Sequence, residues 1–170
     1  MSFKVRAANP NDAKILAELG AETFYYTFRP FNTEEDMQSY IKKAYSEEVI
    51  SQNLQDASIR YAVAFDGTQA IGYTKLLLNG THEKLSGKCV ELEKIYVLQT
   101  TLGKGAGLVL MNEVIEYCKQ QQTAHLFLGV WEENDRAVNF YRKIGFEVFT
   151  SRSFQLGSRW CEDYMMKLDI

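Results

Sequence analysis

A glycine-rich turn is the part of the sequence best suited to hold a small ligand. Glycines stand at positions 103, 105 and 107, and a helical pattern of apolar residues follows them to Gln120. Glycine lets the backbone approach a ligand closely, and the start of a helix adds unpaired N–H groups with a partial positive charge. The turn therefore predicts a phosphate or pyrophosphate site, with a ligand-free tight connection as the alternative, since its spacing matches neither the dinucleotide fingerprint nor the P-loop. The predicted contacts are Gly103, Lys104, Gly105, Ala106, Gly107 and Leu108.

A later helix is predicted over residues 134–144, where Gly145 takes the position after the last turn that glycine favours. Asn134 has the side chain of a helix N-cap, and Tyr141 has that of a core aromatic on an amphipathic helix. On residue types alone, structural roles explain both residues.

The two helices belong to a chain that predicts one mixed α/β (α+β) domain over residues 1–170. This length suffices for one core, and no proline-rich linker divides it. Runs rich in β-forming residues predict strands at 3–7, 59–65, 70–78, 89–98, 126–131, 146–151 and 160–168. Helices are predicted to begin at 9–12, at 32–33 and at Ser46, and to cover 103–120 and 134–144.

Composition excludes several classes of protein. The net charge of −3 argues against nucleic acid as the main partner, because a protein that binds the phosphate backbone of a nucleic acid normally shows a basic excess. Apolar runs such as residues 126–131 are too short to cross a membrane, and residues 1–6 show strand character rather than a signal-peptide core. The three cysteines are scattered without a CxxC pair, so we expect no disulfide framework, no metal site and a cytoplasmic location.

The glycine-rich turn and the later helix together resemble the two motifs of the GNAT (GCN5-related N-acetyltransferase) superfamily. The family's phosphate loop reads Q/R-x-x-G-x-G/A after a strand, and its later helix reads N-x-x-A-x-x-x-Y-x-x-x-G-F. The matching residues here are Gly105, Gly107, Asn134, Ala137, Tyr141, Gly145 and Phe146. Leu102 departs from the loop's usual Gln or Arg, so we expect weaker coenzyme binding rather than none.

This resemblance implies a mixed, mostly antiparallel sheet of about seven strands, splayed between the fourth and fifth strands and flanked by helices. It also implies acetyl-coenzyme A (acetyl-CoA) as cosubstrate, without a metal. The backbone of the segment Ile95, Tyr96 and Val97 would hold the pantetheine arm, with the Val97 amide on the thioester carbonyl. Asn134 would contact the coenzyme near its sulfur, and Tyr141 would lie in the same site.

The implied reaction is direct transfer of acetyl to a primary amine in a ternary complex, which requires the amine to lose a proton. Glu91 and Glu93 are candidate bases, because alternation along a strand places both side chains on one face. Ordered water is the alternative base, and the two carboxylates are then simply solvated. Tyr141 is the candidate acid for the departing thiolate, by its place in the motif. Its ordinary pKa of about 10 lies above a thiol's roughly 8.5, so the proton transfer is uphill in water and requires local tuning. No residue is placed as a covalent nucleophile.

The segment from Thr23 to Asp36 combines closely spaced aromatics with acids, which suits a flexible polycation. Core packing and a favourable helix start explain these residues equally well. This segment, the strand at 91–97 and the helix at 141–146 resemble PaiA-type spermidine/spermine N-acetyltransferases, which implies a small-molecule amine, a polyamine, as acceptor. Peptide or protein N-acetylation and a non-catalytic acetyl-CoA-binding regulator are the alternatives. A homodimer stays open, because the strand at 160–168 can pair within the chain or across an interface.

Overall fold

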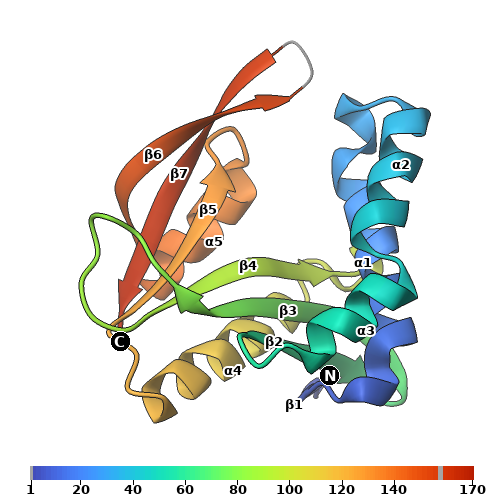
Figure 1. Ribbon diagram of the computed structural model, residues 1–170, viewed down its shortest axis with the longest axis horizontal. Helices are drawn as coiled ribbons and strands as arrows, with labels where there is room; N and C mark the ends of the chain where they lie inside the picture. Colours follow the sequence, from blue (N-terminus) through green and yellow to red (C-terminus); the bar gives the residue numbers. More distant parts are fainter. Residues whose placement is uncertain (1, 157–158) are drawn as a thin grey trace.

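The computed structural model describes residues 2–156 and 159–170 (Figure 1). The strands in this part of the chain are β1 (Lys4–Ala7), β2 (Ile59–Asp66), β3 (Gln69–Gly80), β4 (Cys89–Val97), β5 (His125–Trp131), β6 (Glu147–Leu156) and β7 (Arg159–Asp169). The helices are α1 (Ala13–Phe28), α2 (Glu34–Ala44), α3 (Glu47–Gln55), α4 (Ala106–Gln120) and α5 (Asp135–Ile144). Short 3₁₀ turns are η1 (Pro10–Asp12), η2 (Arg29–Phe31) and η3 (Gln99–Thr101). The predicted α/β (α+β) class is confirmed.

The strands form one sheet in the order β1-β2-β3-β4-β5-β7-β6. All neighbours are antiparallel except β4 and β5, which run parallel. The β4–β5 pairing covers only the three positions from Cys89 opposite His125 to Glu91 opposite Phe127. Beyond these positions the two strands diverge (Figure 1). The predicted splay between the fourth and fifth strands is thus confirmed, and we call the region between the diverging strands the wedge.

Strand β4 carries a bulge at the start of the wedge. Lys75 of β3 pairs with Lys94, but the next residue, Leu76, pairs with Leu92. Glu93 is therefore the extra residue on β4. A bulge bends its strand and changes the direction of the side chains around it. The bend turns β4 away from β5 at the position where their pairing ends.

Helices cover both faces of the sheet. The side chain of Asn53, on α3, donates to the hydroxyl of Tyr61 on β2, so α1–α3 lie over the face that Tyr61 shares with its cross-strand neighbour Lys75. The adjacent residue Leu76 points to the opposite face and packs in a core with Met111 of α4. Figure 1 shows α4 under the first strands and α5 beside β5. We call the face under α1–α3 the acceptor face, because the amine acceptor is expected to reach the sheet from this side.

The boundaries of several elements differ from the predicted ones. Strand β3 continues to Gly80, because Gly80 still pairs with Cys89 of β4. Strands β6 and β7 are longer than predicted and form a hairpin that projects from the body of the molecule (Figure 1). The C-terminal strand β7 pairs within the chain, with β5 and β6. No helix in the described ranges has the length and apolarity needed to span a membrane.

An ion pair between the half-exposed Arg6 and the buried Asp12 anchors the start of the first helix to β1. The Arg6 guanidinium donates to both carboxylate oxygens of Asp12 at 2.7 and 2.9 Å, and the Asn9 amide donates to the same carboxylate at 2.8 Å. Asp12 is only 3% exposed. These hydrogen bonds, led by that of Arg6, lower the pKa of Asp12.

Replacing Asp12 with asparagine is expected to destabilise the protein by about 2 kcal/mol at pH 7, the range for hydrogen bonds to a charged group. A lowered folded-state pKa stabilises the fold above the unfolded pKa, and this contribution is lost as the pH falls through the folded value. Urea unfolding should therefore show a gap between variant and wild type that shrinks below about pH 4. Glu18→Gln, in the exposed pair with Lys14, is the control and should change little. A gap for Asp12→Asn that stays constant with pH would contradict the assignment.

Candidate active site

The glycine-rich turn connects β4 to α4 through two left-handed residues. Gly103 has φ of 76° and Gly105 has φ of 91°, a region that residues with a side chain rarely adopt. Gly105 occupies the N-cap position, so α4 begins at Ala106 rather than at the predicted residue 103. The turn thus presents backbone rather than side chains to its surroundings.

Unpaired amides gather at this turn. The Lys104 amide donates to the Thr101 carbonyl at 3.2 Å, and the Val109 amide makes the first helical bond, to the Gly105 carbonyl at 3.1 Å. Within the described chain, no acceptor is found for the N–H groups of Gly103, Gly105, Ala106, Gly107 and Leu108. A run of such donors at a helix start suits a pyrophosphate, the anion that the coenzyme would bring.

The backbone of β4 also offers groups to the wedge. The Leu98 amide donates to the Ile71 carbonyl of β3 at 2.8 Å. Because amides alternate in direction along an antiparallel pair, those of Ile95 and Val97 point the other way, toward β5. The two strands no longer pair at this level. An extended ligand in the wedge would therefore meet free N–H and C=O groups on β4.

Tyr141 reaches the wedge from α5. It is 9% exposed, and its hydroxyl makes no hydrogen bond within the described ranges. Burial, with a smaller contribution from nearby Tyr96, raises its pKa well above the ordinary tyrosine value. The phenol therefore stays protonated at any physiological pH. It is a proton or hydrogen-bond donor rather than a base.

Asn134 caps α5 as its residue type indicates. Its Oδ1 accepts from the Ala137 amide at 3.2 Å. This bond leaves the Nδ2 group of Asn134 available as a donor at the end of β5, and a contact with the coenzyme stays a prediction.

The two glutamates of β4 differ in their surroundings. Glu93 forms an ion pair of 2.6 Å with Lys75, whose side chain is 12% exposed. Glu91 is half-buried and has no hydrogen bond or ion pair in the described part of the chain, and burial raises its pKa despite the opposing charge of Arg152. Strand pairing places Glu91 on the acceptor face, opposite Leu77, and the ion pair with Lys75 brings Glu93 there as well. Because the bulge at Glu93 interrupts the period-two alternation of β4, the shared face of the two glutamates depends on the bulge as well as on alternation.

Sequence reasoning missed two residues on the far side of the wedge. Arg152 of β6 donates from Nε and Nη2 to Asp163 of β7 at 3.2 and 3.1 Å. Burial raises the pKa of Asp163. Burial also raises the pKa of Tyr96 to about 12, with smaller contributions from the charges of Tyr40, Glu93 and Asp163. Tyr96 therefore lies near a carboxylate from each wall. No local pattern marks Arg152 or Asp163, because strand register alone brings them here.

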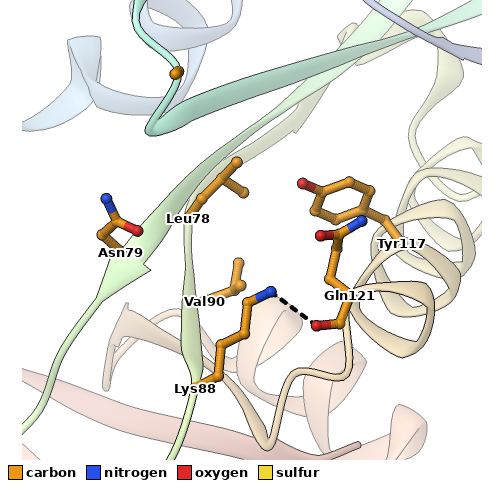
Figure 2. A pocket seen from close by; sticks show the side chains of 7 residues that line it. Leu78, Asn79, Lys88, Val90, Tyr117 and Gln121 are labelled. Atoms are coloured by element: carbon orange, nitrogen blue, oxygen red, sulfur yellow. Dashed lines mark hydrogen bonds between the residues drawn. The ribbon is translucent and has the colours of Figure 1, made fainter.

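A separate cavity of about 170 Å³ lies at the opposite end of β4, against the end of α4 (Figure 2). The Lys88 ammonium there donates to the Gln121 carbonyl at 2.8 Å. The residues that line this cavity are Ala57, Leu78, Asn79, Lys88, Val90, Tyr117 and Gln121. None of the predicted site residues borders this cavity, so the candidate site is the wedge.

The model of the acetyltransferase (GNAT) family matches residues 21–146. The chain belongs to the GNAT family. An uncharacterised N-acetyltransferase of Lactobacillus delbrueckii subsp. lactis, encoded in the pepI 3′ region, is 30% identical over 96% of this chain and 95% of its own. A spermidine N(1)-acetyltransferase of Thermoplasma acidophilum is 26% identical over 87% and 90% of the two chains. The crystal structure of PaiA N-acetyltransferase from T. acidophilum, in complex with coenzyme A, superposes with a TM-score of 0.80 and 25% identity over the full length of both chains.

This GNAT protein is an acetyl-CoA-dependent N-acetyltransferase, so the predicted superfamily, enzyme class and cosubstrate are confirmed. The unpaired amides of the glycine turn fit the coenzyme's pyrophosphate, and the β4 backbone at Ile95 and Val97 fits its extended arm. Acetyl-CoA supplies the acyl group. The chain itself must hold the thioester and manage the protons.

Leu102 gives a test of the glycine turn in this GNAT protein. It is 38% exposed and stands where the family usually has Gln or Arg. Leu102→Arg is expected to tighten coenzyme A binding about two- to fivefold, the value of a partly exposed charge pair. Calorimetric titration should show this gain with coenzyme A and none with pantetheine, which lacks the pyrophosphate. An equal gain with both ligands would place residue 102 away from the phosphates.

Proposed function

We propose that this GNAT protein transfers acetyl from acetyl-CoA to a primary amine of a polyamine such as spermidine or spermine, by direct attack in a ternary complex. The main support is the arrangement of carboxylates on the acceptor face, with Glu91 and Glu93 on β4 and Asp163 on β7. Lys75 pairs with Glu93 and Arg152 pairs with Asp163, whereas Glu91 has no ion-pair partner in the described ranges. Such a surface attracts a flexible amine with several positive charges.

Aromatic side chains of α1 and α2 add to this support. Phe24 stacks on Tyr40 with ring centroids 4.3 Å apart, and Tyr40 is 43% exposed. Burial raises the pKa of Tyr40, and the charge of Glu93 adds to this shift, so the ring lies near that carboxylate. An alkylammonium chain is bound well between aromatic faces and carboxylates. The spermidine acetyltransferase activity in the name of the T. acidophilum relative agrees with this acceptor.

We assign the acyl-donor contacts to the glycine turn and to β4. The amides of residues 103 and 105–108, with Lys104 nearby, hold the pyrophosphate, and the backbone of residues 95–97 holds the pantetheine arm. The Val97 N–H donates to the thioester carbonyl oxygen, where negative charge develops during attack. Asn134 donates from Nδ2 near the sulfur.

We assign the proton steps to side chains on opposite walls of the wedge. Glu91 removes a proton from the substrate ammonium, directly or through water, because it is the glutamate without a direct partner. Glu93, held by Lys75, is the second candidate and serves first to attract the amine. The neutral amine then attacks the thioester carbonyl carbon directly, with no acyl-enzyme. When the tetrahedral intermediate collapses and its C–S bond breaks, the Tyr141 hydroxyl donates a proton to the leaving thiolate.

Release of coenzyme A thiol from acetyl-CoA tests this proposal with spermidine, spermine, a lysine peptide and no acceptor. Release that depends on the polyamines is the expected result. Release with the peptide alone would overturn the polyamine acceptor and leave the enzyme class intact. Coenzyme binding without release for any acceptor would favour a non-catalytic regulator.

A further inference from the structure

An aromatic contact joins the two sides of the wedge on the acceptor face. The ring of Phe31, in η2 between α1 and α2, meets the ring of Trp131 edge-on, with centroids 5.2 Å apart and an interplanar angle of 85°. Phe31 is 51% exposed, and Trp131 is the last residue of β5. The contact therefore connects the helices that cover the first half of the sheet to the strand that begins the second half.

The segment that carries Phe31 is well braced. Pro30 restricts the backbone before it, and the Asn32 side chain donates to the Phe28 carbonyl at 3.0 Å. The Arg29 guanidinium lies over the rings of Tyr25 and Tyr26, 5.9 and 5.6 Å from their centroids. These contacts hold η2 in place, so Phe31 meets Trp131 from a fixed position.

Strand register places this contact beside the carboxylates. Glu91 pairs with Phe127 of β5, and Trp131 lies four residues further along the same face. Asp163 of β7 is directly opposite Trp131. The glycine turn, in contrast, leads into α4 on the other face of the sheet. The amine and the coenzyme would therefore enter the wedge from opposite faces, and the aromatic contact lies on the amine's side.

We propose that the Phe31–Trp131 contact determines acceptor specificity by limiting this entrance to amines on an unbranched chain. This inference rests on the proposed entry of the amine from the acceptor face. A methylene chain passes beside the two rings and places its ammonium between the carboxylates of β4 and β7. A branch next to the amine must separate the rings to reach the same position. Peptide N-termini other than glycine, which are branched at this carbon, are excluded for the same reason.

The test compares 1,4-diaminobutane with 2,5-diaminohexane, which has the same charges and chain but a methyl branch beside each amine. The wild type is expected to prefer the unbranched diamine in kcat/KM by about tenfold or more, the usual discrimination of one methyl group by a closed site. Phe31→Ala and Trp131→Ala should reduce this preference by about tenfold and leave coenzyme A affinity unchanged. Trp160→Ala, which removes an exposed ring on β7, is the matched control and should keep the wild-type ratio.

Phe31→Ala decides the matter, because a half-exposed side chain can be removed without endangering the fold. A wild-type ratio in this variant would overturn the proposal, as would a wild type that uses both diamines equally. If the wild type accepts neither diamine nor spermidine, the polyamine acceptor is wrong, and the same ratio is then measured with n-butylamine and sec-butylamine. Failure of the entrance and failure of the acceptor assignment are thus separate results.

Discussion

Replacing Tyr141 with phenylalanine is expected to lower kcat by about a hundredfold or more, the contribution of a positioned proton donor. The thiolate that leaves acetyl-CoA must be protonated in a site from which water is largely excluded. Tyr141 is buried, makes no hydrogen bond through its hydroxyl within the described ranges, and lies near Tyr96 beside the wedge. Because its pKa is raised, the phenol is fully protonated whenever a substrate binds.

Steady-state thiol release and coenzyme A titration together test this expectation. Coenzyme affinity should be unchanged in Tyr141→Phe, because the ring remains and the glycine turn is untouched. The variant should be as stable as the wild type in urea, since the lost hydroxyl makes no hydrogen bond. Tyr117→Phe, at the separate cavity of Figure 2, is the matched control and should retain full activity. Wild-type kcat in Tyr141→Phe would leave the tyrosine as a core residue only.

Local chemistry explains which parts of the fold the sequence predicts well. Thr33 and Ser46 cap α2 and α3 through side-chain bonds to the amides of Asp36 and Val49. Such bonds reach three residues along the chain, so a short window of sequence contains all the information. The order of strands follows from similar signals, and the motif resemblance supplied the splay between β4 and β5. Element type is therefore predictable even where the ends of strands are not.

Strand register and its irregularities were beyond the reach of sequence reasoning. The bulge at Glu93 depends on how β3 and β4 pair, and this pairing brings Lys75 to the glutamate. Arg152 and Asp163 come from the last hairpin, far from β4 in the chain. The contact of Phe31 with Trp131 joins residues a hundred positions apart. The candidate residues Tyr141, Glu91 and Glu93 were thus named from the sequence. The side chains that pair with the carboxylates, and the aromatic contact at the entrance, could be identified only from the assembled sheet.

Replacing Glu91 with glutamine is expected to lower kcat/KM about a hundredfold and to flatten the acid side of its pH profile. A base must be ionised to act, so wild-type activity should fall as the pH drops through the pKa of the base. Burial raises the pKa of Glu91 above the ordinary glutamate value. The decline should therefore begin at a higher pH than an exposed glutamate would give. Measurement of kcat/KM from pH 5 to 9 with a saturating coenzyme gives the profile.

Glu93→Gln is the matched comparison, because it removes the neighbouring carboxylate and breaks the ion pair with Lys75. Glu93 attracts the amine rather than accepting its proton, so this variant should raise KM and keep the acid limb. If only Glu93→Gln loses the acid limb of the pH profile, Glu93 is the base and Glu91 attracts the amine. If both variants keep the acid limb, ordered water takes the proton from the amine.

Stability measurements separate these outcomes from misfolding. A raised folded-state pKa means that the ionised carboxylate is disfavoured in the fold, with stability lost as the pH rises through that value. Glu91→Gln should consequently be at least as stable as the wild type at pH 7, so that its loss of activity reports the missing base.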